Sequence, residues 1–343
     1  MSKILLIGSR QNKYDPRDTG GVSILFELLI SELEERKIDF KVIDTLVANN
    51  GGKIKTFLMT HYEIIKNIYK YNYISLHASI NTFLFIAPIL ILFSKILNKP
   101  VSIRIFAGDF GNIYAESNIF KKVMIKFVLK NAHSIFFEPK YLVEEFREYN
   151  SNTFWFPNVR NAEIQSNENR SFSKRFVYIG SINEEKGIDD LCEAIVLLKD
   201  EDIVCDIYGP FKYDNEKYSI EYFKEIGVNY KGALKSNEVQ ETMKRYDVLV
   251  LPSYKEGYPG IIIEAFSQGM PIIATRLEGI MEMCIEDVNA VLIDVGEPKQ
   301  ILKAIKSFDE DKYERLHKGS KEAFKNFDSS VQTDLFLERI GIK

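Results

Sequence analysis

Two glutamates, Glu256 and Glu264, stand eight positions apart and flank a turn-forming segment, Gly257-Tyr-Pro-Gly260. The preceding stretch, residues 246–253, is a short apolar run that ends in proline and serine, which predicts a buried parallel strand. The following stretch, Ile261–Phe266, is apolar and predicts a helix. A strand, a turn and a helix in this order place both carboxylates near the carboxyl end of a sheet, where open α/β folds bind ligands. We therefore expect both to face one cleft.

The start of this predicted helix offers binding groups for an anion or a sugar hydroxyl. Pro259 suits the first helical position, and Gly269 followed by Pro271 ends the helix. The N–H groups of Gly260 and Ile261 then lie in the first turn, where they have no partner inside the helix. Such N–H groups, at the positive end of the helix dipole, commonly bind anions.

The sequence contains two similar strand-loop-helix-strand units. Lys3–Ser9 and Arg175–Ser181 are apolar strands that both end in Ile-Gly-Ser, and each is followed by a loop, a helix with an apolar face and a further strand. Alternating strands and helices predict parallel sheets, and two such starts predict two Rossmann-like domains. Neither loop contains Gly-x-Gly-x-x-Gly, so the fingerprint of dinucleotide oxidoreduction is absent.

Length and composition agree with two domains of an ordinary soluble protein. A chain of 343 residues, 45% hydrophobic and 27% charged, can bury a substantial core. Its net charge of −4 gives no global electrostatic argument for nucleic-acid binding. The four histidines show no metal-ligand spacing. Three scattered cysteines are interpreted as core residues in a reducing compartment: Cys192, Cys205 and Cys284.

No segment of the sequence predicts export or a membrane span. The first three residues run directly into the strand Ile4–Ile7, so no signal peptide is expected. Phe83–Phe93 is apolar, but its eleven residues, with Pro88 among them, fall short of the roughly 20 that a membrane helix needs. We interpret it as a buried crossover helix and expect the protein to be cytoplasmic.

Five segments follow one another in the order and spacing of a known family: Asp247–Ser253, Glu256–Gly260, Glu264-Ala265, Gly269–Ala274 and Gly279–Glu282. In these segments the chain resembles the retaining glycosyltransferases of the GT-B fold, family 4 (glycosyl transferases group 1), with their Glu-x7-Glu motif. The resemblance covers most of residues 175–300 strongly and residues 1–160 in outline. It implies an α/β protein of two Rossmann-like domains whose parallel sheets face each other across a cleft.

The domain boundary is placed in Asn158–Lys174, a polar run rich in Asn and Ser without apolar periodicity. We predict an N-terminal domain at 1–160 and a C-terminal domain at 161–325. The resemblance implies that the first domain lies on the acceptor side and that the second binds the nucleotide-sugar donor. It also implies that a closing helix, 326–343, crosses back to the first domain.

The implied activity is transfer of a hexosyl group from a nucleotide-diphosphate sugar, with UDP favoured over GDP. The implied acceptor is a hydroxyl of a glycan or lipid-linked glycan in cell-surface polysaccharide biosynthesis. In a retaining transfer of this kind, the acceptor hydroxyl attacks from the face that the diphosphate leaves, and a diphosphate oxygen takes its proton. The protein then mainly positions the groups and stabilises negative charge on the leaving group.

Lys186 is the leading candidate for the cation that stabilises this leaving group. It lies in the loop 180–187, between a strand and a helix N-terminus, and resembles the Lys-Gly element of the family. Family members commonly carry an arginine where this chain has Ser181, and a hydroxyl brings no charge to a phosphate. Arg104 and Arg276 are candidate substitutes, without a spacing argument for either.

The two glutamates take different roles by resemblance. Glu264, whose ionised carboxylate only accepts hydrogen bonds, is expected to bind the ribose hydroxyls, and Glu256 to lie beside the donor sugar. Backbone N–H groups of the turn between them complete a cradle for sugar and phosphate. Two loops after neighbouring strands are expected to form the nucleoside wall. The predicted donor-binding residues are Gly20, Gly21, Gly180, Ser181, Lys186, Gly209, Tyr230, Gly232, Glu256, Gly257, Tyr258, Pro259, Gly260, Ile261 and Glu264.

The first domain offers fewer candidates. Gly20 and Gly21, within Asp18–Val22, resemble the glycine pair that approaches the donor phosphates or the acceptor, and a plain turn is the alternative. His77 ends a predicted strand where the family often has a histidine, and a core histidine is an equal interpretation. A second family histidine is absent here, which leaves Asp109 as the nearby ionisable candidate. The predicted catalytic residues are Glu256, Lys186 and Asp109.

No metal or other cofactor is expected. Asp200-Glu-Asp202 and Asp309-Glu-Asp311 match the Asp-x-Asp pattern of metal-dependent sugar transferases. Both lie in polar connections between elements, where acidic solvation is the favoured interpretation. Lys186 and backbone dipoles are then expected to neutralise the diphosphate.

One basic amphipathic segment is a candidate for contact with a membrane surface. Its lysines recur among apolar residues: Lys121, Lys122, Lys126 and Lys130. Such a helix can place the protein peripherally on the inner face of the cell membrane, and an ordinary solvated helix face is the alternative.

Two other functions stay open from the sequence. A non-catalytic GT-B partner subunit with a degenerate site fits Ser181 and the missing histidine. A GT-B sugar-nucleotide epimerase or hydrolase is disfavoured, because that class lacks the Glu-x7-Glu context. Donor turnover with a purified acceptor separates these alternatives from a transferase.

Overall fold

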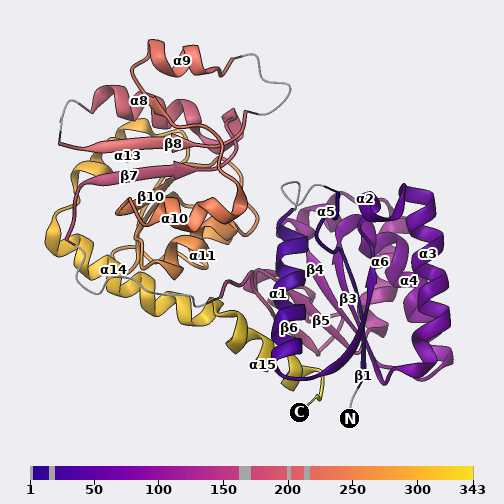
Figure 1. Cartoon of the computed structure of the whole chain (residues 1–343). Coiled ribbons are helices and arrows are strands. Elements are labelled where there is room, and N and C mark those ends of the chain that lie inside the picture. The colour runs from indigo at the N-terminus through magenta and orange to yellow at the C-terminus, as the bar shows by residue number, and fades with distance from the viewer. Residues whose placement is uncertain (1–2, 15–19, 162–170, 199–201, 212–216, 343) are drawn as a thin grey trace. The chain divides into compact units, whose positions relative to one another are not determined.

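The computed structural model describes residues 3–14, 20–161, 171–198, 202–211 and 217–342. The chain divides into two compact α/β units, shown in Figure 1. Unit 1 consists of residues 1–159 and 329–343, and unit 2 of residues 160–328.

Unit 1 is built on a six-stranded sheet in which every recorded strand pair is parallel. Its strand order is β2-β1-β3-β4-β5-β6. In β1, successive side chains from Ile4 to Ile7 are all buried, because helices cover both faces of a parallel sheet. The strands are β1 (Lys3–Gly8), β2 (Asp39–Asp44), β3 (Tyr73–Ser79), β4 (Val101–Phe106), β5 (Ser134–Phe137) and β6 (Thr153–Trp155).

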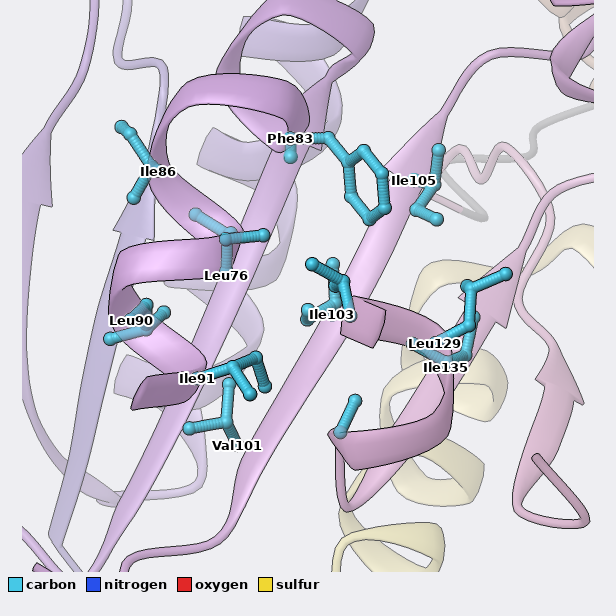
Figure 2. Close-up of a cluster of buried hydrophobic side chains, with 14 of the residues drawn as sticks. Leu76, Phe83, Ile86, Leu90, Ile91, Val101, Ile103, Ile105, Leu129 and Ile135 are labelled. Atoms are coloured by element: carbon cyan, nitrogen blue, oxygen red, sulfur yellow. The ribbon is translucent and has the colours of Figure 1, made fainter. Parts of the chain in front are cut away.

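The helices of unit 1 lie in two layers. One layer packs on the core that contains Leu5 and Ile7, and the other on the core that contains Ile4 and Leu6. Figure 2 shows part of the first core, where Phe83, Leu90 and their neighbours lie against the sheet. The helices are α1 (Gly21–Glu35), α2 (Val47–Asn50), α3 (Lys53–Asn67), α4 (Ile80–Ile96), α5 (Phe110–Glu116), α6 (Ile119–Asn131), α7 (Lys140–Phe146) and α15 (Ser329–Arg339), with the 3-10 turn η1 (Ile68–Lys70).

The apolar segment predicted as a crossover helix is the helix α4, which extends three residues beyond the prediction at each end. Pro88 lies inside it, and Phe83, Leu90 and Ile91 are buried against the sheet. Each such side chain contributes about 1.5–3 kcal/mol when fully buried, which outweighs the local cost of the proline. No helix in the described ranges is both long enough and apolar enough to cross a membrane.

The C-terminal helix α15 packs on α1 within unit 1. Arg36 lies after α1, and its Nε donates to a carboxylate oxygen of Asp334 at 2.8 Å. Ser329 donates a hydrogen bond to Glu32, and Phe336 stacks on Phe156 with ring centroids 5.4 Å apart. These contacts explain why residues 329–342 belong to the first compact unit.

Unit 2 repeats the architecture with the strand order β12-β11-β10-β7-β8-β9, and its recorded pairs are again parallel. Its strands are β7 (Arg175–Ile179), β8 (Val204–Tyr208), β9 (Asn229–Tyr230), β10 (Val248–Leu251), β11 (Ile272–Thr275) and β12 (Ala290–Ile293). Its helices are α8 (Ile188–Leu197), α9 (Ile220–Glu225), α10 (Val239–Met243), α11 (Gly260–Ser267), α12 (Glu278–Met281), α13 (Pro298–Lys306) and α14 (Glu310–Phe324), with 3-10 turns η2 (Glu184–Lys186), η3 (Ser236–Glu238) and η4 (Lys325–Phe327).

Strand β10 is shorter than the predicted stretch 246–253. Asp247, just before it, is fully buried, and its carboxylate accepts hydrogen bonds from the N–H groups of Ser173 and Arg175 at 2.9 Å each. This carboxylate ties the start of β10 to the start of β7. All three cysteines are buried and unpaired, and burial raises the pKa of the Cys192 thiol to about 12.

Candidate functional site

Three predicted glycines meet where β7, β8 and β9 of unit 2 end. Gly209 has a φ of +152°, and a Cβ there would lie 1.7 Å from the carbonyl oxygen of Gly180. The Gly209 N–H donates to the carbonyl of Gly232 at 3.0 Å. The Tyr230 hydroxyl donates to the Gly209 carbonyl at 2.7 Å, and its ring stacks on Phe223. Only glycine allows this approach, so the loops form one continuous wall at the carboxyl edge of the sheet.

Lys186 and Glu256, predicted from separate motifs, are in direct contact. The Lys186 Nζ lies 2.7 Å from Glu256 Oε1, and the Ser253 hydroxyl donates to the same oxygen at 2.8 Å. Gly187, with a φ of +70°, brings η2 against β10, because a Cβ there would lie 2.0 Å from the Pro252 carbonyl oxygen. The close approach of these two segments therefore places the cation beside the carboxylate.

The Lys186–Glu256 pair lies in a partly dehydrated environment. The side chain of Glu256 is 10% exposed and that of Lys186 is 28% exposed. Burial, with a further contribution from the negative charge of Glu256, raises the pKa of Tyr178. That tyrosine stays protonated and donates to the Ser181 carbonyl at 2.8 Å, which holds the loop after β7. An ammonium group has three N–H donors, so Lys186 can bind an anion while it keeps its contact with Glu256.

The helix α11 begins at Gly260, one residue after Pro259, which the sequence suggested as its first residue. Pro259 caps it with an extended backbone (φ −71°, ψ 113°), and Gly260 is the first helical residue, which corrects the placement of Pro259 inside the helix. The Pro259 carbonyl accepts the Ile262 N–H at 3.2 Å, so the N–H groups of Gly260 and Ile261 still lie in the first turn. Gly269, with a φ of +67°, follows the helix end as predicted.

Arg160 is a site residue that the sequence reasoning missed. Its guanidinium contacts Glu264 through Nε, at 2.9 Å from Oε1, and through Nη2. A Cβ at Gly260 would lie 3.0 Å from that Nη2, so the absence of a side chain there leaves room for the arginine. The Arg160 N–H donates to the Phe327 carbonyl at 3.0 Å, which fixes the backbone from which the side chain extends. No local motif marks this residue, because its partner is 104 positions away.

The loop that carries Gly257 and Tyr258 is held by α12. A Cβ at Gly279 would lie 1.8 Å from the Gly257 carbonyl oxygen, so the helix start touches the loop backbone. Tyr258 is 7% exposed, so its ring belongs to the interior of unit 2.

Ser181, where the family commonly has an arginine, and the two candidate substitute arginines lie in different settings. Ser181 is exposed at the end of β7. Arg276 follows β11 and pairs with Asp294 and Glu286, at 3.1 Å in each case. Arg104, in unit 1, is 1% exposed and donates from Nη2 to the Pro157 carbonyl at 2.6 Å, so the structure does not present it to a ligand.

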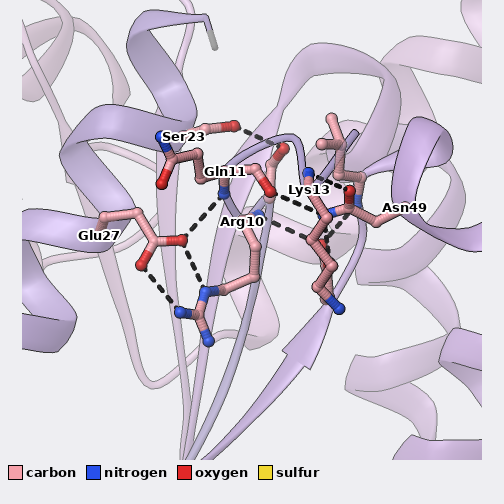
Figure 3. A network of polar contacts seen from close by, with 9 residues as sticks. Arg10, Gln11, Lys13, Ser23, Glu27 and Asn49 are labelled. Atoms are coloured by element: carbon pink, nitrogen blue, oxygen red, sulfur yellow. Dashed lines mark hydrogen bonds and ion pairs between the residues drawn. The ribbon is translucent and has the colours of Figure 1, made fainter. Parts of the chain in front are cut away.

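In unit 1, the glycines Gly20 and Gly21 stand at the N-terminus of α1. Both are exposed, and a Cβ at either would meet no atom within 4 Å, so this structure shows no steric requirement for glycine there. The adjacent Asp18 and Thr19, part of the same predicted motif, lie outside the described residues. Residues 10–13, which follow β1, take part in a polar network that Figure 3 shows.

Arg10 is the centre of that network and was not predicted. Its Nε and Nη2 bind the two carboxylate oxygens of Glu27 at 2.6 and 2.9 Å, a bidentate pair that links the loop to α1. The Gln11 N–H also donates to Glu27, and Asn49 bonds to the backbone of Gln11 and Lys13 (Figure 3). These bonds link residues 10, 11 and 13 to α1 and α2.

His77 lies in the interior of unit 1, at 1% exposure. Its Nε2 lies 2.9 Å from the Ser75 hydroxyl, and its ring packs against Phe26, Phe106 and Phe336. Burial, and secondarily the positive charge of Arg104, lowers its pKa well below the ordinary value. These surroundings match the alternative of a core histidine and give no support to a direct ligand contact.

Two buried charged groups lie near the carboxyl ends of β4 and β5. The Arg104 guanidinium stacks on Phe156, with its central carbon 3.8 Å from the ring centroid. Burial lowers the pKa of Arg104 to about 10, an effect that Glu138 opposes. Burial also raises the pKa of Glu138 to about 7, although the charge of Arg104 pulls it down. Asp109, by contrast, is partly exposed at the start of α5.

Of the two Asp-x-Asp segments, one has a structural role and the other is only partly described. Asp309 caps α14, and its carboxylate accepts the Lys312 N–H at 2.8 Å. Asp200 and Glu201 lie outside the described residues. Over the ranges that the structure covers, no group of three or more His, Cys, Asp or Glu side chains is arranged to hold a metal ion.

Comparison with known families agrees with this site. The family model described as Glycosyl transferases group 1 matches residues 159–326, which is nearly the whole of unit 2. This segment, just under half of the chain, matches that family. The predicted relationship to the group 1 glycosyltransferases is confirmed for this segment, and the Lys186–Glu256 and Arg160–Glu264 pairs lie inside the matched range.

Curated relatives carry related names. An uncharacterized glycosyltransferase of Methanocaldococcus jannaschii is 24% identical over 326 residues, which cover 90% of each chain. The N,N'-diacetylbacillosaminyl-diphospho-undecaprenol alpha-1,3-N-acetylgalactosaminyltransferase of Campylobacter jejuni is 26% identical over 155 residues, 45% of this chain and 40% of that protein.

Solved structures share the fold at low sequence identity. Anabaena HepE in complex with UDP has a TM-score of 0.73 and 15% identity, with 99% of this chain and 100% of that chain covered. The lipopolysaccharide outer core galactosyltransferase WaaB in its apo form has a TM-score of 0.66 and 16% identity, with 99% of each chain covered. These likenesses confirm the predicted GT-B fold of the group 1 glycosyltransferase.

The four lysines predicted as a membrane-contacting set do not all face solvent. Lys121 and Lys130 are exposed. Lys122 donates from Nζ to the Ala115 carbonyl at 2.8 Å, and the Lys126 Nζ lies 5.4 Å from the Tyr149 ring centroid. The side chains of Lys122 and Lys126 thus contact other residues of unit 1. No comparison bears on a membrane role for the four lysines.

Proposed function

We propose that this group 1 glycosyltransferase is a retaining, metal-independent enzyme. It transfers a hexosyl group from a UDP-sugar to a hydroxyl of a glycan or lipid-linked glycan in cell-surface polysaccharide biosynthesis. The observation that carries the proposal is the contact of Lys186 Nζ with Glu256 Oε1 at 2.7 Å, beside the N-terminus of α11. At the carboxyl edge of the unit 2 sheet, the cation and the helix N–H groups can bind a diphosphate, and the carboxylate can contact the attached sugar.

The donor is proposed to bind along the carboxyl edge of the unit 2 sheet. Glu264 accepts hydrogen bonds from the ribose hydroxyls, in an orientation that Arg160 holds. The wall formed by Gly180, Gly209 and Gly232 is proposed to lie beside the nucleoside, because Gly209 approaches the Gly180 carbonyl too closely for any side chain and leaves bare backbone there. The roles of these residues remain predictions from the family resemblance and the geometry.

Lys186 is proposed to act on the leaving group. When the bond between sugar and diphosphate breaks, negative charge grows on the diphosphate, and a cation already in place stabilises it without reorganisation. In the structure Glu256 neutralises this cation, and a diphosphate brings more negative charge than one carboxylate. Glu256 then has its carboxylate beside the sugar, where positive charge develops in the transition state.

The choice of UDP and of a polysaccharide acceptor draws support from relatives. HepE, which shares the fold, has been solved with UDP, with UDP and glucose, and with UDP-glucose. The Campylobacter relative is named for a diphospho-undecaprenol acceptor, and other relatives are named for capsular polysaccharide and lipopolysaccharide core biosynthesis. These names describe those proteins. For this chain they support the proposal of a UDP-sugar donor and a polysaccharide acceptor.

The test is turnover by the purified full-length protein with a panel of UDP- and GDP-sugars and diphospho-undecaprenol glycan acceptors. We expect UDP release that depends on the acceptor, and a product whose anomeric configuration by NMR matches that of the donor. Turnover only with GDP-sugars overturns the donor, and an inverted product overturns the retaining mechanism. Epimerised or hydrolysed donor without transfer points to the epimerase or hydrolase alternative. No turnover with any donor or acceptor would favour a non-catalytic partner subunit.

A further inference from the structure

The outer face of α3 carries a stripe of exposed apolar side chains. They are spaced four, four, three and four positions apart, which is one face of a helix. The stripe, called the α3 stripe below, consists of Ile54, Leu58, Tyr62 and Ile65 on α3 and of Tyr69 on η1, which are 79%, 61%, 62%, 51% and 61% exposed. A single exposed apolar residue needs no explanation, but a contiguous row on one helix indicates an interaction surface.

The opposite face of α3, which packs on unit 1, is mostly polar. Its buried residues are Thr56, Thr60, Ile64 and Asn67. Thr56 donates to the Gly52 carbonyl at 2.8 Å, and Asn67 accepts from Lys41 Nζ at 3.2 Å. A surface helix of a globular protein normally buries its apolar side and exposes its polar side. α3 does the reverse, so its apolar side is available to something outside the unit.

Exposed apolar residues continue from α3 onto neighbouring helices. α3 packs beside α4, and α4 packs beside α6, on the same face of the sheet. Figure 1 shows α3 along the outer side of this unit, next to α4. The exposed residues on α4 are Phe85, Leu92 and Ile96, and those on α6 are Ile119, Phe120 and Val123; each is at least 53% exposed.

The same elements are strongly basic. α3, η1, α4 and α6 contain nine lysines and one acidic residue, Glu63, in a chain whose net charge is −4. Glu63 is paired with Lys41 at 3.2 Å and lies 4.0 Å from Lys66. The lysines are Lys53, Lys55, Lys66, Lys70, Lys95, Lys121, Lys122, Lys126 and Lys130.

We propose that the α3–α4–α6 face of unit 1 docks on an anionic lipid bilayer, with the α3 stripe inserted among the headgroups. Interfacial helices combine apolar side chains on one face with flanking lysines, and tyrosine suits the boundary between headgroups and acyl chains. Each lysine near an anionic surface adds attraction. The docking goes beyond the proposed transfer reaction and does not depend on it.

Charge decides between a bilayer and a second copy of this chain. In a two-fold symmetric dimer through this face, the exposed lysines of one subunit would lie against those of the other, with one glutamate per subunit to offset them. A bilayer that contains anionic lipid supplies both the complementary charge and the apolar layer. A bilayer surface also accommodates apolar residues that are spread over three helices, whereas a second copy of the chain would need a complementary shape.

The test is co-sedimentation of the full-length protein, without donor or acceptor, with phosphatidylcholine vesicles and with vesicles that also contain phosphatidylglycerol. We expect binding to the anionic vesicles that weakens with salt. The double variant Ile54→Ser/Leu58→Ser should lower the vesicle partition constant about tenfold or more, because it removes two inserted side chains. The matched control is Val196→Ser/Ile220→Ser in unit 2, where the residues are 54% and 61% exposed. The control should bind like the wild type.

The outcomes separate the alternatives. Equal losses in the α3 variant and the unit 2 control, or no binding to anionic vesicles at low salt, overturn the proposal. If analytical ultracentrifugation shows a wild-type dimer that the α3 variant converts to monomer, while vesicle binding is unchanged, the stripe is a protein interface. Because binding is measured without turnover, failure of the transferase proposal leaves this result intact. The altered side chains are exposed, so circular dichroism should show an unchanged fold.

Discussion

Arg160 and Glu264 are joined across 104 positions of the chain, with Arg160 Nε 2.9 Å from Glu264 Oε1. Their side chains are 14% and 16% exposed, so the pair is largely shielded from water. Glu264 lies on α11, and Arg160 is anchored by its backbone bond to Phe327. The carboxylate expected to bind ribose is thus oriented by a residue from the very start of unit 2.

The first prediction concerns this pair. Glu264→Gln should weaken UDP binding roughly 10- to 100-fold, the range for loss of a charged hydrogen-bond acceptor. Arg160→Ala should raise KM more than it lowers kcat, because it leaves Glu264 without its orienting partner. Arg160→Lys should recover only part of the affinity, since an ammonium cannot reproduce the planar fork. Calorimetric titration with UDP measures the affinities, and steady-state kinetics measure KM and kcat of the Arg160→Ala variant.

The control for these variants is Arg276→Ala, which removes an exposed arginine that also bonds to two carboxylates. UDP affinity unchanged by Glu264→Gln would contradict the ribose assignment. An equal effect from Arg276→Ala would mean that the loss of affinity is not specific to the Arg160–Glu264 pair.

The sequence predicted the site best where the chemistry is local. The Lys-Gly loop, the two glutamates and the glycines at strand ends all follow strands that apolar runs mark clearly. Pro259 was placed one residue too far inside α11, because sequence alone does not show the backbone angle at which a helix begins. Arg160 was missed because its role depends on a contact formed only in the folded chain.

The surface of α3 shows a second limit of sequence reasoning. Apolar residues at helical spacing predict an amphipathic helix, but the spacing does not say which face meets the core. In α3 the polar side is buried and the apolar stripe is exposed. The lysines of α6, by contrast, were recognised, although Lys122 and Lys126 fold back toward unit 1.

The second prediction concerns Lys186. If it stabilises the leaving diphosphate, its interaction is strongest in the transition state, where negative charge is greatest. Lys186→Ala should then lower kcat by roughly 10²–10³ with a smaller change in KM. Steady-state kinetics with a saturating acceptor measure both constants. A rise in KM at constant kcat would show that Lys186 binds only the ground state.

The third prediction concerns Ser181, which stands where the family resemblance leads one to expect arginine. Ser181 is exposed, so a longer side chain can extend from this position. Ser181→Arg should add a charged contact to the diphosphate and tighten UDP binding without loss of turnover. Ser181→Gln, of similar length but neutral, is the matched control. Loss of activity in the arginine variant alone would mean that this protein holds its donor differently.

The fourth prediction concerns metal. With the diphosphate neutralised by Lys186 and backbone N–H groups, activity should persist after dialysis against EDTA. Rates with added Mg²⁺, Mn²⁺ or EDTA, measured at fixed ionic strength, provide the comparison. Abolition by EDTA with recovery on Mg²⁺ or Mn²⁺ would refute the metal-independent mechanism. It would direct attention to Asp109 and to the two Asp-x-Asp segments.

The fifth prediction concerns the pH dependence of stability in unit 1. Burial raises the pKa of Glu138 to about 7, so folded unit 1 retains a proton that the unfolded chain has released at lower pH. Stability from this group is therefore complete below its ordinary pKa and falls as pH rises toward 7. Glu138→Gln keeps the shape but cannot ionise. Relative to this variant, the wild type should lose about 1–3 kcal/mol of unfolding free energy between pH 4.5 and 7.5.

The chain has one tryptophan, Trp155, in β6 of unit 1, so its fluorescence during urea unfolding reports on this unit. Burial lowers the pKa of Arg104 only to about 10, so its guanidinium stays charged over the whole pH range of the comparison. The lowered pKa of His77 gives stability that rises with pH, but this contribution is common to both proteins and cancels in the difference. Parallel pH profiles for wild type and Glu138→Gln would mean that Glu138 ionises normally in the folded protein.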